Sequence, residues 1–278
     1  MEIDIGLGKA GRRGYHLDDV SIVPSRRTRD ADDIDVSWQL DAYAFEHPIT
    51  VFGGDPLAST GGLVVTKAQL PGGEIDIDQI EATISDTNEL GAVSAVGVRP
   101  QVVEAILGRL MKADLDLLFI RGRVVSAEHV SKSQEPLNLK QVVRRLEVPV
   151  VVGGCASYPA ALHLMRTGAA AIVVGVDAGS RGVGVLLATA IADARAARMH
   201  HLDETGVYVH LIAAGPLHTG GDIAKAIVCG ADAVMIDEGD LPDGGVEPLV
   251  AGLRRTMATC GYETLKEFQM ADLVVVSR

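Results

Sequence analysis

The chain of 278 residues has few of the features that mark several common classes of protein. It has three cysteines, Cys155, Cys229 and Cys260, and no C-x-x-C pair, so neither a disulfide framework nor a zinc cluster fits. No apolar run reaches the about 18 residues of a membrane-spanning helix, and charges at Glu2 and Asp4 interrupt any secretory signal. We therefore expect a soluble protein of the reducing cytoplasm.

Positive charge is also scarce. Lys and Arg total 25 against 37 Asp and Glu, which gives a formal net charge of −12. A chain of this charge repels nucleic-acid phosphates and anionic lipid, so we expect neither nucleic acid nor a membrane as a partner. Apolar residues, in contrast, make up 47% of the chain. A chain of this length can bury about three-quarters of its unfolded surface without disulfides or metals.

Apolar runs rich in Val and Ile recur along the chain. None alternates with a period of two, which is typical of strands buried on both faces. The predicted strands are Ile49–Phe52, Gly62–Thr66, Ala92–Val96, Asp116–Arg121, Val148–Gly153, Ala170–Gly175, Val207–Ala213 and Ala231–Ile236. Helical spacing separates most of them, over Ile77–Gly91, Pro100–Lys112, Tyr158–Gly168, Leu186–Met199 and Gly221–Gly230. Eight strands with intervening helices predict a single parallel (β/α)8 TIM barrel. An open doubly wound sheet is the alternative, but no G-x-G-x-x-G opens a first βα unit.

One helical crossover is too short to exist. About eight residues join the first strand to the second, whereas a helical crossover needs at least 10–12. Eight extended residues span roughly 26–29 Å, enough to return along one strand without a helix. We therefore expect a missing or shortened first helix. In this single domain, residues 1–47 form an N-terminal arm, residues 48–245 the barrel, and residues 246–278 a C-terminal helix and tail.

Six segments have recognisable sequence patterns. They are YHLDDVSIVPSRRTR (Tyr15–Arg29), IRGRVVSAEHVS (Ile120–Ser131), LNLKQVVRRLEVPVVVGG (Leu137–Gly154), ALHLMRTGAAAIVVG (Ala161–Gly175), GGDIAKAIVCGADAVMI (Gly220–Ile236) and GLRRTMATCGYETLKEFQ (Gly252–Gln269). Together they resemble the IMP dehydrogenase/GMP reductase family, and most closely its IMP-dehydrogenase-related subfamily without the regulatory CBS insert. The resemblance covers most of the chain in the right order. It implies a barrel related to purine nucleotide metabolism that uses NAD or NADP, and a homo-oligomer, commonly a tetramer.

The resemblance stops at the loop after the sixth strand. In the family, a cysteine on this loop attacks C2 of the purine nucleotide while NAD(P) exchanges a hydride. Here Gly179-Ser180 and the later Gly182–Gly184 match the family pattern, but one residue, Arg181, replaces the cysteine and everything else between them. Without a thiolate at this position, the covalent adduct cannot form there.

The nucleotide contacts of the family are altered as well. Its Asp-Gly-Gly after the seventh strand, where the Asp holds the ribose, is Ala214-Gly215-Pro216 here, and proline has no N–H to offer a phosphate. Its Gly-Ser after the eighth strand is Asp237-Glu238 here. Two carboxylates repel a phosphate where the family's amides would bind it.

The strand ends nevertheless supply candidate site residues. Candidate catalytic residues are Cys155 as a nucleophile, Asp55, and His218 as a general base. Candidate phosphate or substrate contacts are Gly179, Ser180, Arg181 and Gly215, and candidate cofactor contacts are Arg121 and Gly122. The rim carboxylates Asp177, Asp237 and Glu238 could bind Mg²⁺ but are expected to pair with Arg121 and Arg181, so no metal site is assigned.

Each candidate has a structural alternative. Cys155 could be a buried core residue, His218 a solvated loop histidine, and the Gly179–Arg181 segment a solvent-facing turn. Three functions remain open. The chain is a degenerate or repurposed family barrel that binds a small molecule or nucleotide, an active NAD(P)-dependent oxidoreductase with a variant mechanism, or a non-catalytic scaffold or regulatory subunit.

Overall fold

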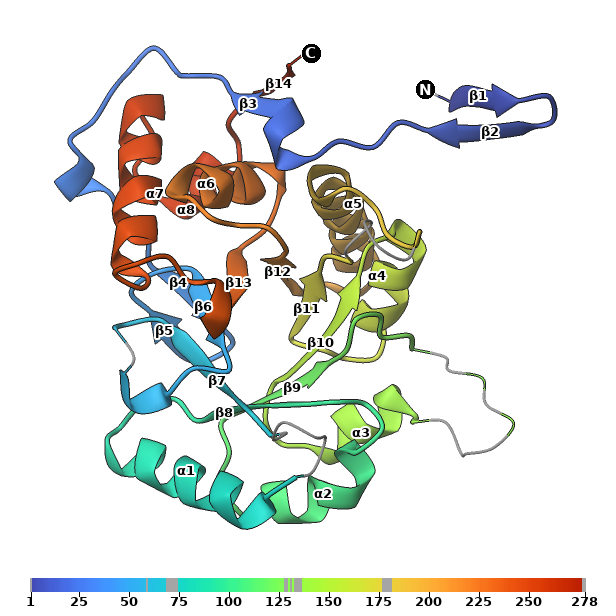
Figure 1. The fold of residues 1–278 in the computed structure, drawn as a ribbon, viewed down its shortest axis with the longest axis vertical. Coiled ribbons are helices and arrows are strands. Elements are labelled where there is room, and N and C mark those ends of the chain that lie inside the picture. Colours follow the sequence, from blue (N-terminus) through green and yellow to red (C-terminus); the bar gives the residue numbers. More distant parts are fainter. Residues whose placement is uncertain are drawn as a thin grey trace.

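The computed structural model describes residues 2–58, 60–68, 75–127, 130, 132, 137–176 and 182–276. Its centre is a closed barrel of eight parallel strands, each paired with its neighbours in chain order, the last with the first (Figure 1). The strands are β6 (Ile49–Phe52), β7 (Leu63–Lys67), β8 (Ala95–Val98), β9 (Leu117–Arg121), β10 (Val150–Cys155), β11 (Ala171–Val174), β12 (His210–Ala214) and β13 (Ala233–Asp237). The predicted (β/α)8 barrel is confirmed.

Burial explains why the strands show no alternation in the sequence. Every residue of β6, β8, β10 and β11 is buried, because one face of each strand fills the barrel and the other packs on helices. The outer helices are α1 (Ile77–Glu89), α2 (Val103–Leu110), α3 (Leu139–Arg145), α4 (Tyr158–Met165), α5 (Leu187–Thr205), α6 (Gly220–Cys229) and α7 (Glu247–Cys260).

The expected gap in the outer ring is present. Between β6 and β7 the described residues contain only a short 3-10 helix, η3 (Pro56–Ala58). The other connections hold regular helices, several of which begin at a side-chain cap. For example, Ser157 accepts the N–H of Ala160 at the start of α4, and Thr219 and Asp222 form a reciprocal capping box at the start of α6.

The N-terminal arm closes one end of the barrel. Strands β4 (Trp38–Leu40) and β5 (Tyr43–Phe45) form a hairpin at the amino ends of the barrel strands. The hydroxyl of Tyr43 donates to Asp116 at 2.9 Å, just before β9, and the Trp38 ring packs edge-on against His210 at the start of β12. The carboxyl ends of the strands are therefore the end available for a site, as in barrel enzymes generally.

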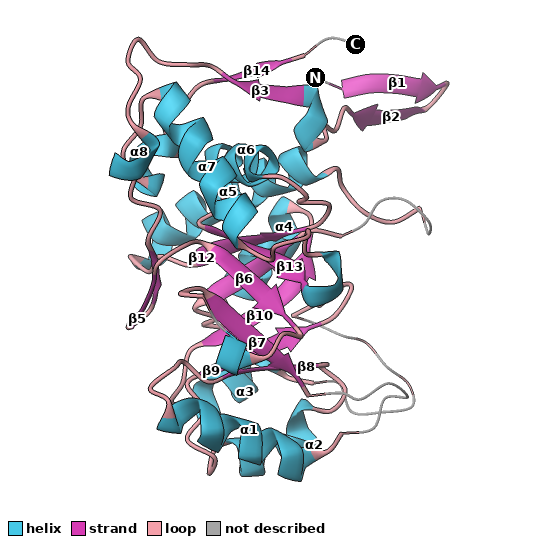
Figure 2. Cartoon of the chain, turned by 60° about the vertical axis from the view of Figure 1, so that its left-hand side comes forward, coloured by secondary structure: helices cyan, strands magenta, loops and turns pink. Residues whose placement is uncertain are grey.

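The rest of the arm lies outside the barrel. Strand β3 (Val20–Ile22) pairs with the C-terminal strand β14 (Leu273–Val275). Strands β1 (Glu2–Gly6) and β2 (Lys9–Arg12) form a hairpin that projects away from the helices (Figures 1 and 2). An ion pair between Arg12 and Asp193 of α5 holds its base.

Three features differ from the sequence-based expectations. Helix α3 and the β1–β2 hairpin were not predicted. The C-terminal helix expected within residues 246–278 is divided into α7 and α8 (Leu265–Phe268). The division falls at Gly261, whose φ of 82° is left-handed and where a Cβ would overlap the carbonyl oxygen of Arg27. Within the described residues, no helix combines the length and apolar character needed to cross a membrane.

Candidate functional site

A cavity of about 510 Å³ lies at the carboxyl ends of the strands. We call it the mouth cavity. It is bordered by the ends of β9 to β13 and by the start of α5. Its ionisable lining residues are His16, Arg121, Arg123, His218, Asp237 and Asp240. A volume of this size is ordinary for a small-molecule site.

An ion pair crosses the mouth of the barrel. Nη1 of Arg121 donates to Oδ1 of Asp237 at 2.7 Å. Arg121 ends β9 and Asp237 ends β13, and these strands lie four places apart in either direction around the ring of eight. The pair therefore joins opposite sides of the barrel. Of the sequence-based alternatives for Asp237, ion pairing with Arg121 is the one that the geometry contains.

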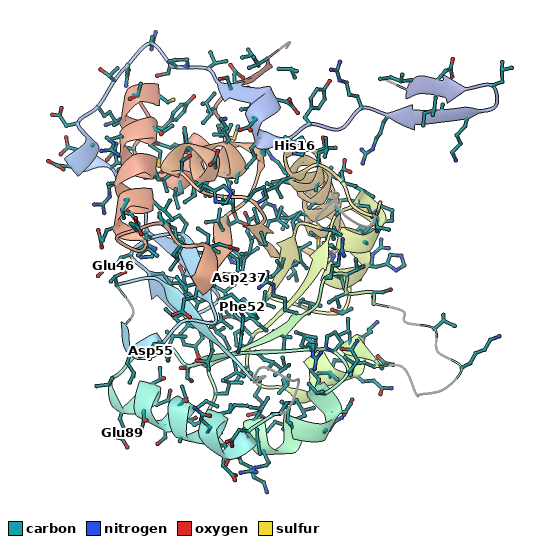
Figure 3. All side chains as sticks on the ribbon, in the orientation of Figure 1. His16, Glu46, Phe52, Asp55, Glu89 and Asp237 are labelled. Atoms are coloured by element: carbon teal, nitrogen blue, oxygen red, sulfur yellow. The ribbon has the colours of Figure 1, made fainter. Side chains whose placement is uncertain are left out.

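Phe52 supports this ion pair. The Arg121 guanidinium lies 4.3 Å from the centre of the Phe52 ring, and the ammonium of Lys67 lies 5.1 Å from it. Phe52 ends β6 and is buried, near Asp237 in Figure 3. Stacking of a cation on an aromatic face contributes about 0.5–2 kcal/mol, depending on how much water is excluded. The guanidinium of Arg121 is thus engaged both by a carboxylate and by a ring.

Cys155 ends β10 but does not line the mouth cavity. Its side chain is 1% exposed, and burial raises the pKa of the thiol to about 12. The neutral thiol is therefore favoured at neutral pH, whereas a nucleophilic cysteine needs its thiolate. The structural alternative, a buried core cysteine, describes its position.

The glycines of the mouth are explained by packing. Gly122 donates its N–H to the carbonyl oxygen of Gly153 at 2.8 Å. A Cβ on Gly215 would lie 3.0 Å from Cδ2 of Leu187, and a Cβ on Gly175 would overlap the carbonyl oxygen of the neighbouring strand. Gly175 therefore needs glycine whether or not a ligand binds, and a side chain at Gly215 would require Leu187 to move.

The structure does not bring all the candidate residues together. Asp55 and Glu238 lie beside a separate cavity of about 180 Å³ near η3, together with the buried His47. Oδ1 of Asp55 accepts the N–H of Leu57 at 3.0 Å, which is a local turn contact. Of the remaining candidates, His218 lines the mouth cavity. Asp177, Gly179, Ser180 and Arg181 lie outside the described residues.

Sequence reasoning missed three of the ionisable lining residues. His16 belongs to the N-terminal arm, and Arg123 and Asp240 lie just beyond the strand ends. Only tertiary packing places the arm beside the mouth, so no local pattern could have assigned His16. Its neighbour Tyr15 opens the first segment of the family resemblance, which was the available signal. Among the described residues, no group of His, Cys, Asp and Glu is arranged to hold a metal ion.

The fold and the mouth cavity define a parallel barrel with its site at the strand carboxyl ends. Comparison with known proteins assigns the family. The model of the IMP dehydrogenase / GMP reductase domain matches residues 14–241. The chain belongs to this family.

Several relatives match over nearly the whole chain. An uncharacterized oxidoreductase of Mycolicibacterium smegmatis is 38% identical over 374 residues, which covers 99% of this chain and 100% of the relative. The inosine-5'-monophosphate dehydrogenase of Pasteurella multocida is 35% identical over 56% of this chain and 31% of its own. The crystal structure of an IMP dehydrogenase/GMP reductase-like protein from Corynebacterium glutamicum has a TM-score of 0.83 at 35% identity, covering 99% of this chain and 97% of that one.

The alignment with the Mycolicibacterium smegmatis protein is longer than this chain. The match to the Mycolicibacterium smegmatis protein spans 374 positions, whereas this chain has 278 residues. The relative therefore has many residues for which this chain has no counterpart, although both chains are covered from end to end.

Proposed function

We propose that this chain is a repurposed member of its family, whose mouth cavity binds a small molecule without oxidising or reducing a purine nucleotide. The Arg121–Asp237 ion pair stacked on Phe52 is the observation that carries the proposal. It puts a carboxylate where the family resemblance expects amide N–H groups for a phosphate. It also occupies the arginine that could have neutralised that phosphate.

The electrostatic magnitudes favour this interpretation. A carboxylate about 4 Å from a phosphate charge repels it by about 4 kcal/mol at an effective dielectric constant near 20. One charge-assisted hydrogen bond returns about 1.5–3 kcal/mol. A purine nucleotide would first have to separate Asp237 from Arg121, and the freed carboxylate would then face the phosphate.

The residues that line the mouth cavity support the proposal that the chain does not oxidise or reduce a purine nucleotide. Within the described residues, no cysteine lines the mouth cavity, and the thiol at the end of β10 has a pKa raised to about 12. Covalent catalysis by the family mechanism needs a thiolate that reaches the purine ring. The mouth offers the other ingredients of a binding site, which are a cavity of ordinary volume and ionisable groups of both signs.

The nicotinamide cofactor of the family does not fit the residues described here. Arg121 is held by Asp237, and the N–H of Gly122 already donates to Gly153. These two residues were the candidate cofactor contacts. The single N–H of Gly122 is used within the protein, and the guanidinium of Arg121 lies beside the Asp237 carboxylate, which would repel a pyrophosphate. We therefore propose no role for NAD or NADP in this chain.

Activity measurements test the proposal directly. The purified chain is incubated with IMP and NAD⁺, and separately with GMP and NADPH, and the reduced nicotinamide is followed by its absorbance. We expect no turnover above the rate without protein. A turnover near 1 s⁻¹, which is ordinary for enzymes, would overturn the proposal and establish the oxidoreductase alternative.

Native mass spectrometry of the freshly purified chain tests binding at the mouth. We expect a small molecule to be retained, and to be lost in Arg121→Gln, which changes the cavity wall. Arg109→Gln is the matched control, because it removes an arginine paired with Asp78 and Glu81 on the outer helices. A chain that retains nothing, and whose melting temperature shifts with none of IMP, GMP, NAD⁺ or NADPH, would point to the scaffold alternative. Ligand at 100 times its dissociation constant would stabilise the fold by about 2.7 kcal/mol.

The resemblance also supports two proposals about the setting of the molecule. We propose that the chain forms a homo-oligomer in the cytoplasm, as its family commonly does. Sedimentation equilibrium of the purified chain is the test. A single species of 29.2 kDa at all concentrations would contradict self-association.

A further inference from the structure

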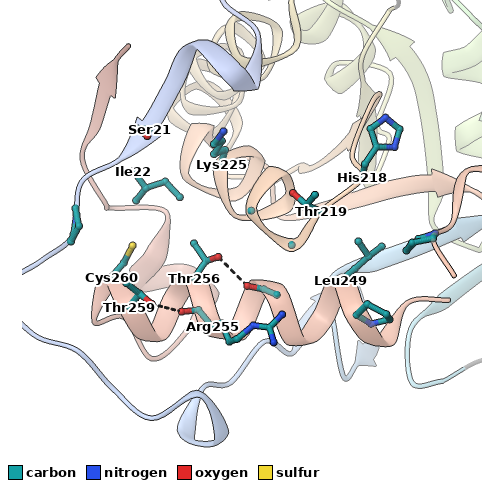
Figure 4. Close-up of a pocket in the computed structure, with 16 residues that line it drawn as sticks. Ser21, Ile22, His218, Thr219, Lys225, Leu249, Arg255, Thr256, Thr259 and Cys260 are labelled. Atoms are coloured by element: carbon teal, nitrogen blue, oxygen red, sulfur yellow. Dashed lines mark hydrogen bonds between the residues drawn. The ribbon is translucent and has the colours of Figure 1, made fainter. Parts of the chain in front are cut away.

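A second, larger cavity lies outside the barrel, between α6, α7 and strand β3. Its volume is about 670 Å³, and Figure 4 shows its 16 lining residues. We call it the α6–α7 groove. The two helices touch where Gly220 meets Gly252, and a Cβ on Gly220 would overlap the backbone of α7. Because both positions are glycines, the helices cross closely and no side chain fills the space at the crossing.

The charges of the groove are all of one sign. Lys225 of α6 and Arg255 of α7 line it, and Thr256 lies between them in the view of Figure 4. None of the 16 lining residues is an aspartate or a glutamate. In a chain with 37 acidic and 25 basic residues, a cavity with cations and without carboxylates stands apart from its surroundings.

These two cations also lack partners. Seven other arginines form ion pairs with carboxylates, among them Arg121 in the mouth and Arg198 in the core. Within the described part of the chain, Lys225 and Arg255 form none. Two cations on one cavity whose lining contains no carboxylate give that cavity a positive potential.

Several polar groups beside Lys225 and Arg255 already have hydrogen-bond partners within the protein. The carboxylate of Asp222 lies close by, but it is held by the N–H and the hydroxyl of Thr219 and caps the first turn of α6. The hydroxyls of Thr256 and Thr259 already donate to backbone carbonyls one turn earlier. The capping groups of α6 and the hydroxyls of Thr256 and Thr259 are thus satisfied, and the charged donors of the groove are the ammonium of Lys225 and the guanidinium of Arg255.

We propose that the α6–α7 groove binds a phosphorylated small molecule, held by Lys225 and Arg255. Its volume exceeds that of a single ion and lies within the range of small-molecule sites. A guanidinium binds phosphate oxygens through two parallel hydrogen bonds, and an ammonium adds a point charge. The groove is separate from the mouth cavity, although His218 lines both. The proposal does not depend on the function proposed for the mouth.

Isothermal titration at constant ionic strength tests this site, with pyrophosphate as the phosphate probe and citrate as a carboxylate of comparable charge. We expect pyrophosphate to bind with a stoichiometry of one. Lys225→Gln and Arg255→Gln should each weaken binding about tenfold or more, and the double variant should abolish it. Lys140→Gln is the matched control, because Lys140 is exposed on α3, across the barrel from α6.

Each other outcome overturns the proposal. Absence of pyrophosphate binding at millimolar concentration would exclude the site. Equal weakening in Lys140→Gln would indicate attraction by overall charge. Loss in Arg121→Gln with no loss in the two groove variants would place the anion in the mouth cavity instead. Binding of citrate as tight as that of pyrophosphate would refute the assignment to phosphate. Circular dichroism of every variant establishes that it is folded.

Discussion

Replacing Asp232 by asparagine should destabilise the fold more than any surface substitution. Its carboxylate accepts from Nη1 of Arg198 and the N–H of Leu211 at one oxygen, and from the hydroxyl of Tyr208 and the amide of Gln269 at the other. The Arg198 side chain is 4% exposed and that of Asp232 13%. This network ties α5, the start of β12 and the C-terminal region to the amino end of the barrel.

The expected cost follows from burial. An asparagine has one acceptor oxygen and one amide that donates, so two donors lose their acceptor and the guanidinium is left buried without a counter-charge. Removing one partner of a buried ion pair costs about 3–5 kcal/mol. For a chain of this size, each kcal/mol lowers the melting temperature by about 2–4 °C, so we expect a decrease of about 6–20 °C.

Urea unfolding followed by circular dichroism measures the change. Asp243→Asn is the control, because Asp243 is exposed in the loop before α7 and the substitution removes the same charge. A double-mutant cycle with Arg198→Met isolates the pair, and we expect the double variant to cost less than the sum of the two single ones. The reasoning is wrong if Asp232→Asn costs under about 1 kcal/mol, as exposed pairs do.

Two further predictions concern proton binding and close packing. Burial lowers the pKa of His210, so the unfolded chain binds its proton more readily, and stability should fall as pH decreases below about 6.5. Urea midpoints at pH 7.5 and 5.5 should differ less in His210→Gln than in the wild type, whereas the exposed His163→Gln should leave the difference unchanged. Gly175→Ala should prevent stable folding, because φ is +144° and a Cβ would overlap the backbone of β12. Gly108→Ala, with open space around it in α2, should instead raise the melting temperature, and the reverse order would refute the packing argument.

The barrel could be predicted because its signals are local. Buried parallel strands leave continuous apolar runs, and a connection of about eight residues is too short for a helical crossover whatever the rest of the chain does. The boundaries were less certain. β8 begins at Ala95 and not at Ala92, and α3 was missed, since a seven-residue helix contains too few turns to show a period.

The site was predicted only in part, because it depends on how strand ends face one another. Arg121 and Asp237 were placed on one rim, and pairing between rim carboxylates and arginine was the favoured interpretation. Asp55 and Glu238 were placed on the same rim but line a different cavity. Residues around the end of a barrel can point away from its axis, so a position on the rim does not bring two side chains together. The two cations of the groove come from helices whose close crossing only the tertiary structure shows.

The missing first helix has a consequence for the order in which the barrel assembles. β6 and β7 are joined by a short connection, so their pairing closes a small loop, whereas Thr50 of β6 also pairs with Met235 of β13 across most of the chain. Loop-closure entropy rises with the logarithm of loop length, so the β6–β7 pair forms at lower entropic cost than the seam between β13 and β6. Long-range pairing of this kind slows folding. We therefore expect the seam to close last, and the ion pair across the mouth to form only after both halves of the barrel have met.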